Sequence, residues 1–113
     1  MGRNTLGALE QSVMIVVLAL GEGAYGVAIR NELSRRTQRI HSFGAVYTTL
    51  DRLSGKGLLT SRLGEPTPER GGQAKRFFKL TGEGQEMLTR AMQSQHALGQ
   101  GLNLGDTIQP AEG

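Results

Sequence analysis

Two short segments with strand-like sequence, LLTSRL at 58–63 and KRFFKL at 75–80, constrain the fold of this chain more than any other feature. The segment between them, GEPTPERGGQA, contains Pro and Gly residues, which cannot continue a strand ladder. Two strands this close in sequence pair antiparallel, because a parallel pair needs a long crossover. The sequence therefore predicts one β-hairpin with a long basic loop.

The rest of the chain up to Leu98 has the period of amphipathic helices. Apolar residues at 9, 13, 16, 17 and 20 predict a first helix, and YGVAIRNELSRRT at 25–37 predicts a second. Ser42 is a suitable N-cap for a third helix, which ends at GKG, residues 55–57. Thr81 is a suitable N-cap for a fourth helix. After Leu98 there is no periodicity and many helix breakers, so we expect a mobile tail over 99–113 and one domain over 1–98.

Three helices, a strand, a basic loop, a strand and a helix, in this order, are typical of a winged helix-turn-helix. The predicted fold class is therefore α+β and mainly helical, with three helices, a two-stranded wing hairpin and a C-terminal helix. The chain of 113 residues is long enough for one modest core. There is no internal repeat.

Composition excludes several classes of protein. The chain has no cysteine, which rules out disulfides and thiolate metal sites. Its longest apolar run, VMIVVLAL at 13–20, is far shorter than the ~20 residues of a membrane span, and the N-terminus does not resemble a signal peptide. We expect a cytoplasmic protein with no membrane association.

Positive charge is concentrated in the middle of the chain. Residues 30–80 contain 11 Lys and Arg against 4 Asp and Glu, whereas the net charge of the whole chain is only +3. Such segregation indicates that the middle of the chain faces a polyanion. A basic but merely solvated surface is the alternative interpretation.

The segment GEGAYG at 21–26 matches G-x-G-x-x-G, which raises the possibility of a dinucleotide site. That interpretation needs VMIVVLAL as a parallel strand and Asp51 as the ribose ligand, but further βαβ units are missing and Glu22 would oppose a pyrophosphate. A turn between two helices, with Gly supplying positive φ, is favoured. Free N–H groups around Ala24, Tyr25 and Gly26 could still meet a DNA phosphate.

The third helix has the features of a recognition helix, because one side is small and polar. We expect Arg52 to contact guanine and Ala45 to contact a thymine methyl group. Tyr47 is expected to pack toward the core, with its hydroxyl near a phosphate. The apolar stripe is predicted at Phe43, Val46, Tyr47, Leu50 and Leu53, and the DNA-facing residues are Ser42, Gly44, Ala45, Tyr47, Thr48, Thr49 and Arg52.

The hairpin loop combines positive charge with a flexible tip, as expected of a wing that crosses the DNA backbone or enters a minor groove. The predicted contact residues are Arg70, Gly71, Gly72, Gln73, Lys75 and Arg76. Phe77 and Phe78 should point to opposite sides of the strand, so that at least one of them lies in the core.

No catalytic chemistry is indicated. His41 and His96 are far apart in sequence, there is no paired-carboxylate signature, and no His, Asp and Glu cluster has metal-ligand spacing. We expect no enzyme, no cofactor and no metal. The rival interpretations are a winged-helix module that binds another protein and, on GEGAYG, a nucleotide-dependent enzyme.

Three segments in order, YGVAIRNEL, GAVYTTLDRLSGKGLLTSR and GGQAKRFFKLTGEG, resemble the PadR family of bacterial transcriptional regulators over roughly residues 8–90. The resemblance implies a dimeric winged helix-turn-helix that binds operator DNA, usually as a repressor and sometimes released by a small molecule. It implies that Tyr25, the face from Ser42 to Arg52 and the wing from Arg70 to Arg76 face DNA. Ala-Val-Tyr-Thr replaces the Thr-Leu-Tyr-Pro of many members, and there is no Trp for a stacked drug pocket.

The first and fourth helices are predicted to join two copies of the chain. The first helix is apolar on more than one side, which a small monomer could not cover, and the fourth carries a second apolar stripe. The predicted dimerisation residues are Leu9, Val13, Val16, Leu88, Ala91 and Met92. Such a homodimer would bind a near-palindromic operator in double-stranded DNA.

Overall fold

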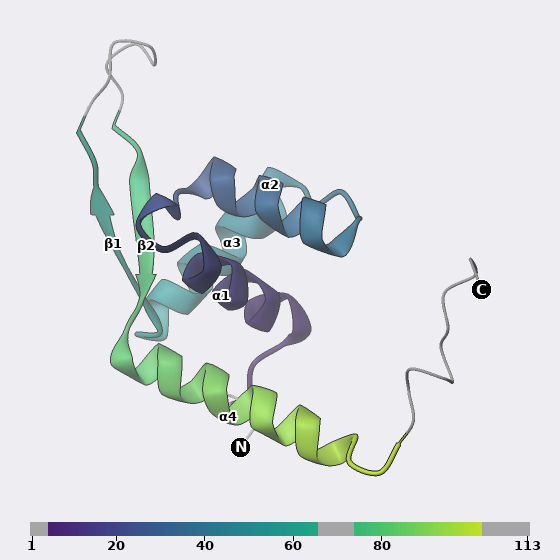
Figure 1. The fold of residues 1–113 in the computed structure, drawn as a ribbon. Helices are drawn as coiled ribbons and strands as arrows, with labels where there is room; N and C mark the ends of the chain where they lie inside the picture. Colours follow the sequence, from purple (N-terminus) through teal and green to yellow (C-terminus); the bar gives the residue numbers. More distant parts are fainter. Residues whose placement is uncertain (1–4, 66–73, 103–113) are drawn as a thin grey trace.

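Four helices, a single 3-10 turn and one antiparallel hairpin form the part of the chain that the structure describes, residues 5–65 and 74–102 (Figure 1). The structure is a computed structural model. Its elements are α1 (Ala8–Leu20), the 3-10 helix η2 (Gly21–Gly23), α2 (Gly26–Thr37), α3 (Phe43–Gly55), β1 (Leu59–Leu63), β2 (Arg76–Leu80) and α4 (Gly82–Leu98). This order confirms the predicted winged helix-turn-helix. Most of the predicted tail, residues 103–113, lies outside the described residues.

The core is built around α1, which lies between α2 and α4 (Figure 1). α1 also contacts α3 and β2, so that neighbours cover it on several sides. The hairpin adds Leu59, Phe78 and Leu80 to this core, in the register Leu59 opposite Leu80. Phe78 is thus the core phenylalanine of the predicted pair. None of the described helices is both long and apolar enough to cross a membrane.

Three of the predicted dimerisation residues lie inside the domain, so their assignment to a dimer surface is wrong. Val13 is fully buried, and Val16 and Leu88 retain only 2% and 3% of their exposure within a single chain. The reason is that α2, α3, β2 and α4 cover most of the wide apolar surface of α1. Leu9 and Ala91 are half-buried, whereas Met92 is exposed.

The segment between α1 and α2 pairs with strand β2 of the hairpin over a short stretch. The backbone N–H of Phe78 donates to the Ala24 carbonyl at 2.8 Å, and Tyr25 forms an isolated antiparallel bridge with Phe77. Ala24 is completely buried there. This pairing fixes the start of α2 against the base of the wing, and nothing in the local sequence indicated it.

GEGAYG is the turn between α1 and α2. Gly21 has a φ of +59° at the C-terminus of α1, and its N–H donates to Val17. VMIVVLAL is helix rather than strand, so the dinucleotide interpretation is wrong. The N–H groups of Ala24 and Tyr25 donate to the carbonyls of Gly21 and Gly23, so the expectation that these two are free for a phosphate is also wrong.

An ion pair joins α1 to the end of α3. The side chain of Glu10 is only 9% exposed, and its carboxylate accepts a hydrogen bond from the Gly7 N–H at 2.8 Å and pairs with Lys56 Nζ at 2.9 Å. Burial raises the pKa of Glu10, but the Gly7 and Lys56 hydrogen bonds and the charges of Lys56 and Arg52 outweigh it, so the pKa is lowered from 4.5. The carboxylate therefore stabilises the fold in its ionised form.

We expect Glu10→Gln to lower the free energy of unfolding at neutral pH by about 1–2 kcal/mol, because Lys56 loses its partner. Since the folded-state pKa of Glu10 is depressed, its contribution is present above the ordinary value of 4.5 and is lost as pH falls through the folded value. Urea denaturation at neutral pH and near pH 3 should show the difference between wild type and variant shrinking in acid. A difference of the same size at both would contradict this role. Glu86→Gln is the control, because its ion pair with Arg90 is exposed.

Candidate nucleic-acid interface

The exposed side of α3 carries most of the residues predicted to face DNA. Ser42 caps the helix by accepting from the Ala45 N–H at 3.0 Å, as its sequence position indicated. The other predicted residues of the helix, apart from Thr49, are also exposed. The residues of α3 and its cap that can meet a ligand are therefore Ser42, Gly44, Ala45, Tyr47, Thr48 and Arg52.

Thr49 is the exception, and its outward placement is wrong. It is 2% exposed and its hydroxyl donates to the Ala45 carbonyl at 2.8 Å. At 100° per residue, Thr49 lies about 40° from the buried Leu53 and about 60° from the buried Val46, at the edge of the buried side of the helix. Its methyl group joins the core while its hydroxyl is satisfied within the helix.

Phe43 and Tyr47, which the apolar stripe was predicted to bury, are both 41% exposed. Their rings stack with centroids 6.3 Å apart, and the guanidinium of Arg30 lies 4.5 Å from the centre of the Phe43 ring. Arg30 and Phe43 are thus candidate interface residues that the sequence did not indicate. The spacing of Phe43 and Tyr47 at i and i+4 was the available signal.

Tyr47 fixes how close α3 comes to α2. A Cβ atom built on Gly26, the first residue of α2, would collide with the ring of Tyr47. The last glycine of GEGAYG is therefore required by packing between two helices rather than by a nucleotide. This contact holds the recognition helix at a fixed distance from the start of α2.

We expect Gly26→Ala to destabilise the protein by about 1–3 kcal/mol, because the Tyr47 ring must move to admit a methyl group. Weaker DNA binding should accompany the loss, since Tyr47 belongs to α3. Gly23→Ala is the matched control, because a Cβ at Gly23 has nothing within 4 Å. Thermal unfolding of both variants checks the prediction, and equal melting temperatures would contradict it.

The base of the wing holds its cations on aromatic rings. Lys75 Nζ lies 4.3 Å from the centre of the Tyr25 ring, and Tyr25 packs edge-on against Phe77 with centroids 5.6 Å apart. Arg76 donates to Ser61 Oγ at 3.0 Å. The other predicted wing residues, Arg70, Gly71, Gly72 and Gln73, lie outside the described residues.

A cleft of about 310 Å³ joins the wing base to the recognition helix. Tyr25 comes from the α2 side, Tyr47 and Asp51 from α3, and Lys75 and Arg76 from the hairpin. The structure therefore brings together predicted residues from three separate parts of the sequence. Asp51 is an acidic member of the cleft that was not among the predicted DNA-facing residues.

The turn between α2 and α3 is fixed by its own hydrogen bonds. Arg30 Nε donates to the His41 carbonyl at 2.7 Å, and the His41 N–H donates to Ser34 Oγ at 3.1 Å. The imidazole of His41 lies 3.0 Å from Thr37 Oγ1. His41 is thus part of the structure that orients α3.

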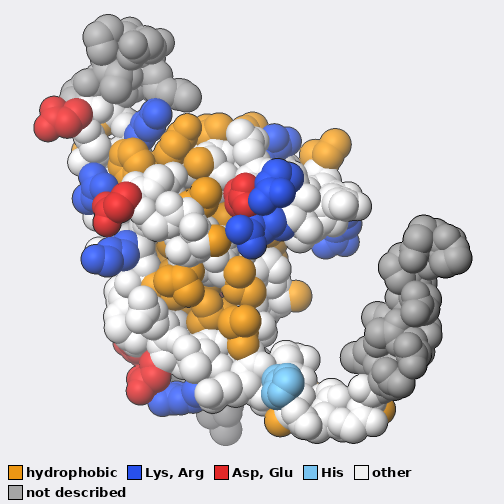
Figure 2. All heavy atoms as spheres, viewed as in Figure 1, with side chains coloured by type: hydrophobic (Ala, Val, Ile, Leu, Met, Phe, Trp, Pro, Cys, Tyr) orange, Lys and Arg blue, Asp and Glu red, His pale blue; other side chains and the backbone are white. Residues whose placement is uncertain are grey.

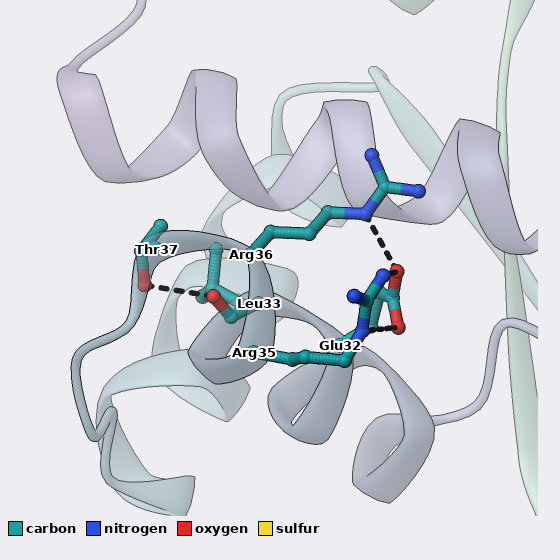
Figure 3. Close-up of polar contacts among 5 residues, drawn as sticks. All are labelled: Glu32, Leu33, Arg35, Arg36 and Thr37. Atoms are coloured by element: carbon teal, nitrogen blue, oxygen red, sulfur yellow. Dashed lines mark hydrogen bonds and ion pairs between the residues drawn. The ribbon is translucent and has the colours of Figure 1, made fainter.

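Two arginines of α2 are paired away from the recognition helix. Glu32 binds Arg35 and Arg36, each at 2.6 Å, while Thr37 donates to the Leu33 carbonyl (Figure 3). The hydrogen bonds from the two arginines lower the pKa of Glu32 to about 2. Figure 2 shows charged side chains on the near side of α2. In the same view in Figure 1, α3 runs behind α2, on its far side. Not all of the positive charge in residues 30–80 therefore faces one surface.

An exposed helix after a tight helical turn, beside a hairpin with cations at its base, defines a winged helix-turn-helix of the kind that binds DNA. Residues 14–90 match the Transcriptional regulator PadR-like family. The chain belongs to this family, as its sequence resemblance predicted, and DNA-binding regulation of transcription is the role that membership implies.

Solved structures of the same family have the same fold. A PadR-like transcription factor from Bacteroides fragilis is 28% identical, with a TM-score of 0.69 over 89% of this chain and 90% of that chain. A PadR family regulator from Eggerthella lenta is 26% identical, with a TM-score of 0.65 over 89% and 86%. A PadR-like regulator from Bacillus cereus, 21% identical, agrees in fold with a TM-score of 0.70 over 92% and 94%. No curated protein matches the sequence.

Proposed function

We propose that this protein is a cytoplasmic, sequence-specific repressor that binds a near-palindromic operator as a homodimer. The observation that carries the proposal is the cleft in which α3 meets the wing base, because Tyr47 and Asp51 of α3 line it together with two cations of the hairpin, Lys75 and Arg76. Membership of a family of transcriptional regulators supports it.

In this arrangement α3 enters the major groove and the wing follows the flanking backbone. Gly44 and Ala45 keep the first turn of α3 slim enough for close approach to base edges. Lys75 and Arg76 lie where phosphates flank the groove, and they supply affinity that does not depend on sequence. The stacked Phe43 and Tyr47 extend the contact surface toward Arg30.

The second copy of the chain is proposed to cover the outer part of α4 and the remaining exposed side of α1. From Met92 to Leu98 every side chain of α4 is exposed, including Met92 at 49% and Leu98 at 73%. Leu18 of α1 is 54% exposed, and Figure 2 shows hydrophobic side chains gathered between α2 and α4. An apolar surface on one copy matches itself across a two-fold axis, which would pair two recognition helices on one operator.

Sequence selection from random duplex DNA, followed by titration of the selected duplex, tests the repressor proposal. We expect one enriched near-palindromic sequence, bound by two copies of the chain. Light scattering tests the dimer in parallel, with Met92→Glu as the disrupting variant and Gln93→Glu, also exposed on α4, as its matched control. A monomeric wild type at micromolar concentration would overturn the dimer, and no enriched sequence would favour the rival role as a protein-binding module.

A further inference from the structure

The positions of α3 that point most directly away from the core are those opposite its buried side. Val46, Thr49, Leu50 and Leu53 are the buried positions of this helix. At 100° per residue, the positions opposite are Gly44, Thr48, Asp51 and Gly55, and all four are exposed. The two glycines have no side chain and Thr48 has a short one, so Asp51 is the charged group that projects from this surface.

Asp51 lines the cleft and, within the part of the chain that the structure describes, has no ion pair of its own. Among residues 5–65 and 74–102, the ion pairs do not include Asp51. The neighbouring cations of the cleft have other contacts, Lys75 on the Tyr25 ring and Arg76 on Ser61. Asp51 also takes part in none of the side-chain hydrogen bonds of these residues, so within the described part of the chain both carboxylate oxygens can accept from a ligand.

Arg52, the residue predicted to read guanine, lies to one side of these positions. Its charge is close enough to Glu10 of α1 to contribute to the lowered pKa of that carboxyl. Position 52 is also about 80° from Gly44 at 100° per residue, whereas Asp51 is about 20° from it. Asp51 is thus better placed than Arg52 to meet base edges.

A carboxylate at this position selects strongly among the groups that DNA presents. It repels phosphates and the acceptor atoms of guanine, and it accepts from the exocyclic amino group of cytosine or adenine, with cytosine N4 the usual partner of Asp. We propose that Asp51 is a specificity-determining residue, which accepts a hydrogen bond from an exocyclic amino group in the major groove and disfavours DNA that lacks one there. This inference rests on the proposed function, since it needs α3 in the groove.

The test compares the full-length wild type with Asp51→Asn, which keeps the shape of the side chain and removes its charge. Each is used in sequence selection from random duplex DNA, and each is titrated with the selected operator and with a random duplex. Glu86→Gln is the matched control, because it also removes one exposed negative charge but lies on α4. Circular dichroism of the variants verifies that they fold.

We expect the wild type to require cytosine or adenine at one position in each half-site, with about a tenfold loss for the other bases. Asp51→Asn should relax or change that position, bind random DNA several times more tightly and lose about tenfold of its discrimination, while Glu86→Gln keeps the wild-type values. An unchanged base preference and discrimination in Asp51→Asn would overturn the inference alone. A wild type that selects no sequence would overturn the proposed function, and this inference with it.

Discussion

Raising the salt concentration from 50 to 200 mM is expected to weaken DNA binding by about 10³- to 10⁵-fold, if a dimer makes roughly six to ten phosphate contacts. Each contact releases condensed counterions, so the logarithm of affinity falls linearly with the logarithm of salt, with a slope near −0.9 per phosphate. The cations at the wing base, Lys75 and Arg76, are the proposed source of part of this slope, since both line the cleft beside α3.

Two variants that each remove one positive charge distinguish a direct contact with DNA from a general effect of net charge on binding. Lys75→Ala should reduce the slope by about 0.9 for each subunit that contacts DNA and weaken all sequences about equally. Arg35→Ala should leave the slope unchanged, because Arg35 is paired with Glu32 on α2. Fluorescence anisotropy over a series of salt concentrations measures both. Equal changes of the salt slope in the two variants would show that the cleft beside α3 is not the DNA interface.

Replacing Gly84 with Ala is expected to destabilise the protein strongly, by about 1–3 kcal/mol, which is roughly a five- to 150-fold shift toward the unfolded state. A Cβ atom at Gly84 would collide with the Leu58 carbonyl group. The backbone at Leu58 cannot move aside as a side chain can, because it is tied to the N-terminus of α4. The Thr81 N–H donates a hydrogen bond to the Leu58 carbonyl, and the Thr81 hydroxyl donates one to the Gly57 carbonyl. The start of α4 would therefore have to lift from the hairpin.

Gly82→Ala is the control that separates this collision from helix propensity. Gly82 is the first residue of the same helix, it is exposed, and a Cβ there has nothing within 4 Å. Ala in place of Gly favours a helix by up to about 1 kcal/mol, so we expect Gly82→Ala to be neutral or stabilising. Urea denaturation of the two variants should give shifts of opposite sign. Matching shifts would mean that the close approach to Leu58 carries no cost.

Local features of the sequence were enough to predict the order of the elements and their ends. Ser42 and Thr81 cap helices because each side chain accepts from an N–H three residues ahead, Ala45 and Gly84. The Pro and Gly residues between the two strands forced a hairpin for an equally local reason. The family resemblance also depended on short segments, and it was confirmed.

The rotation of each helix about its axis could not be predicted in the same way. Periodicity indicated that α3 has a buried side, but it assigned Phe43 and Tyr47 to that side and Thr49 to the exposed one. The rotation is set by contacts with α1, α2 and β1, which come from other parts of the chain. That rotation also brings Asp51, rather than Arg52, to the centre of the exposed surface.

The sequence by itself determined the elements, their order and the class of protein, since capping, turns and helical period act between residues a few positions apart. Only the tertiary structure decided that Val13 and Val16 belong to the core, that Gly26 and Gly84 admit close neighbours, and that Asp51 shares a cleft with Lys75. The physical reason is that burial and close approach depend on which distant segments meet. An apolar helix such as α1 has the same local pattern whether its own domain or a second copy covers it.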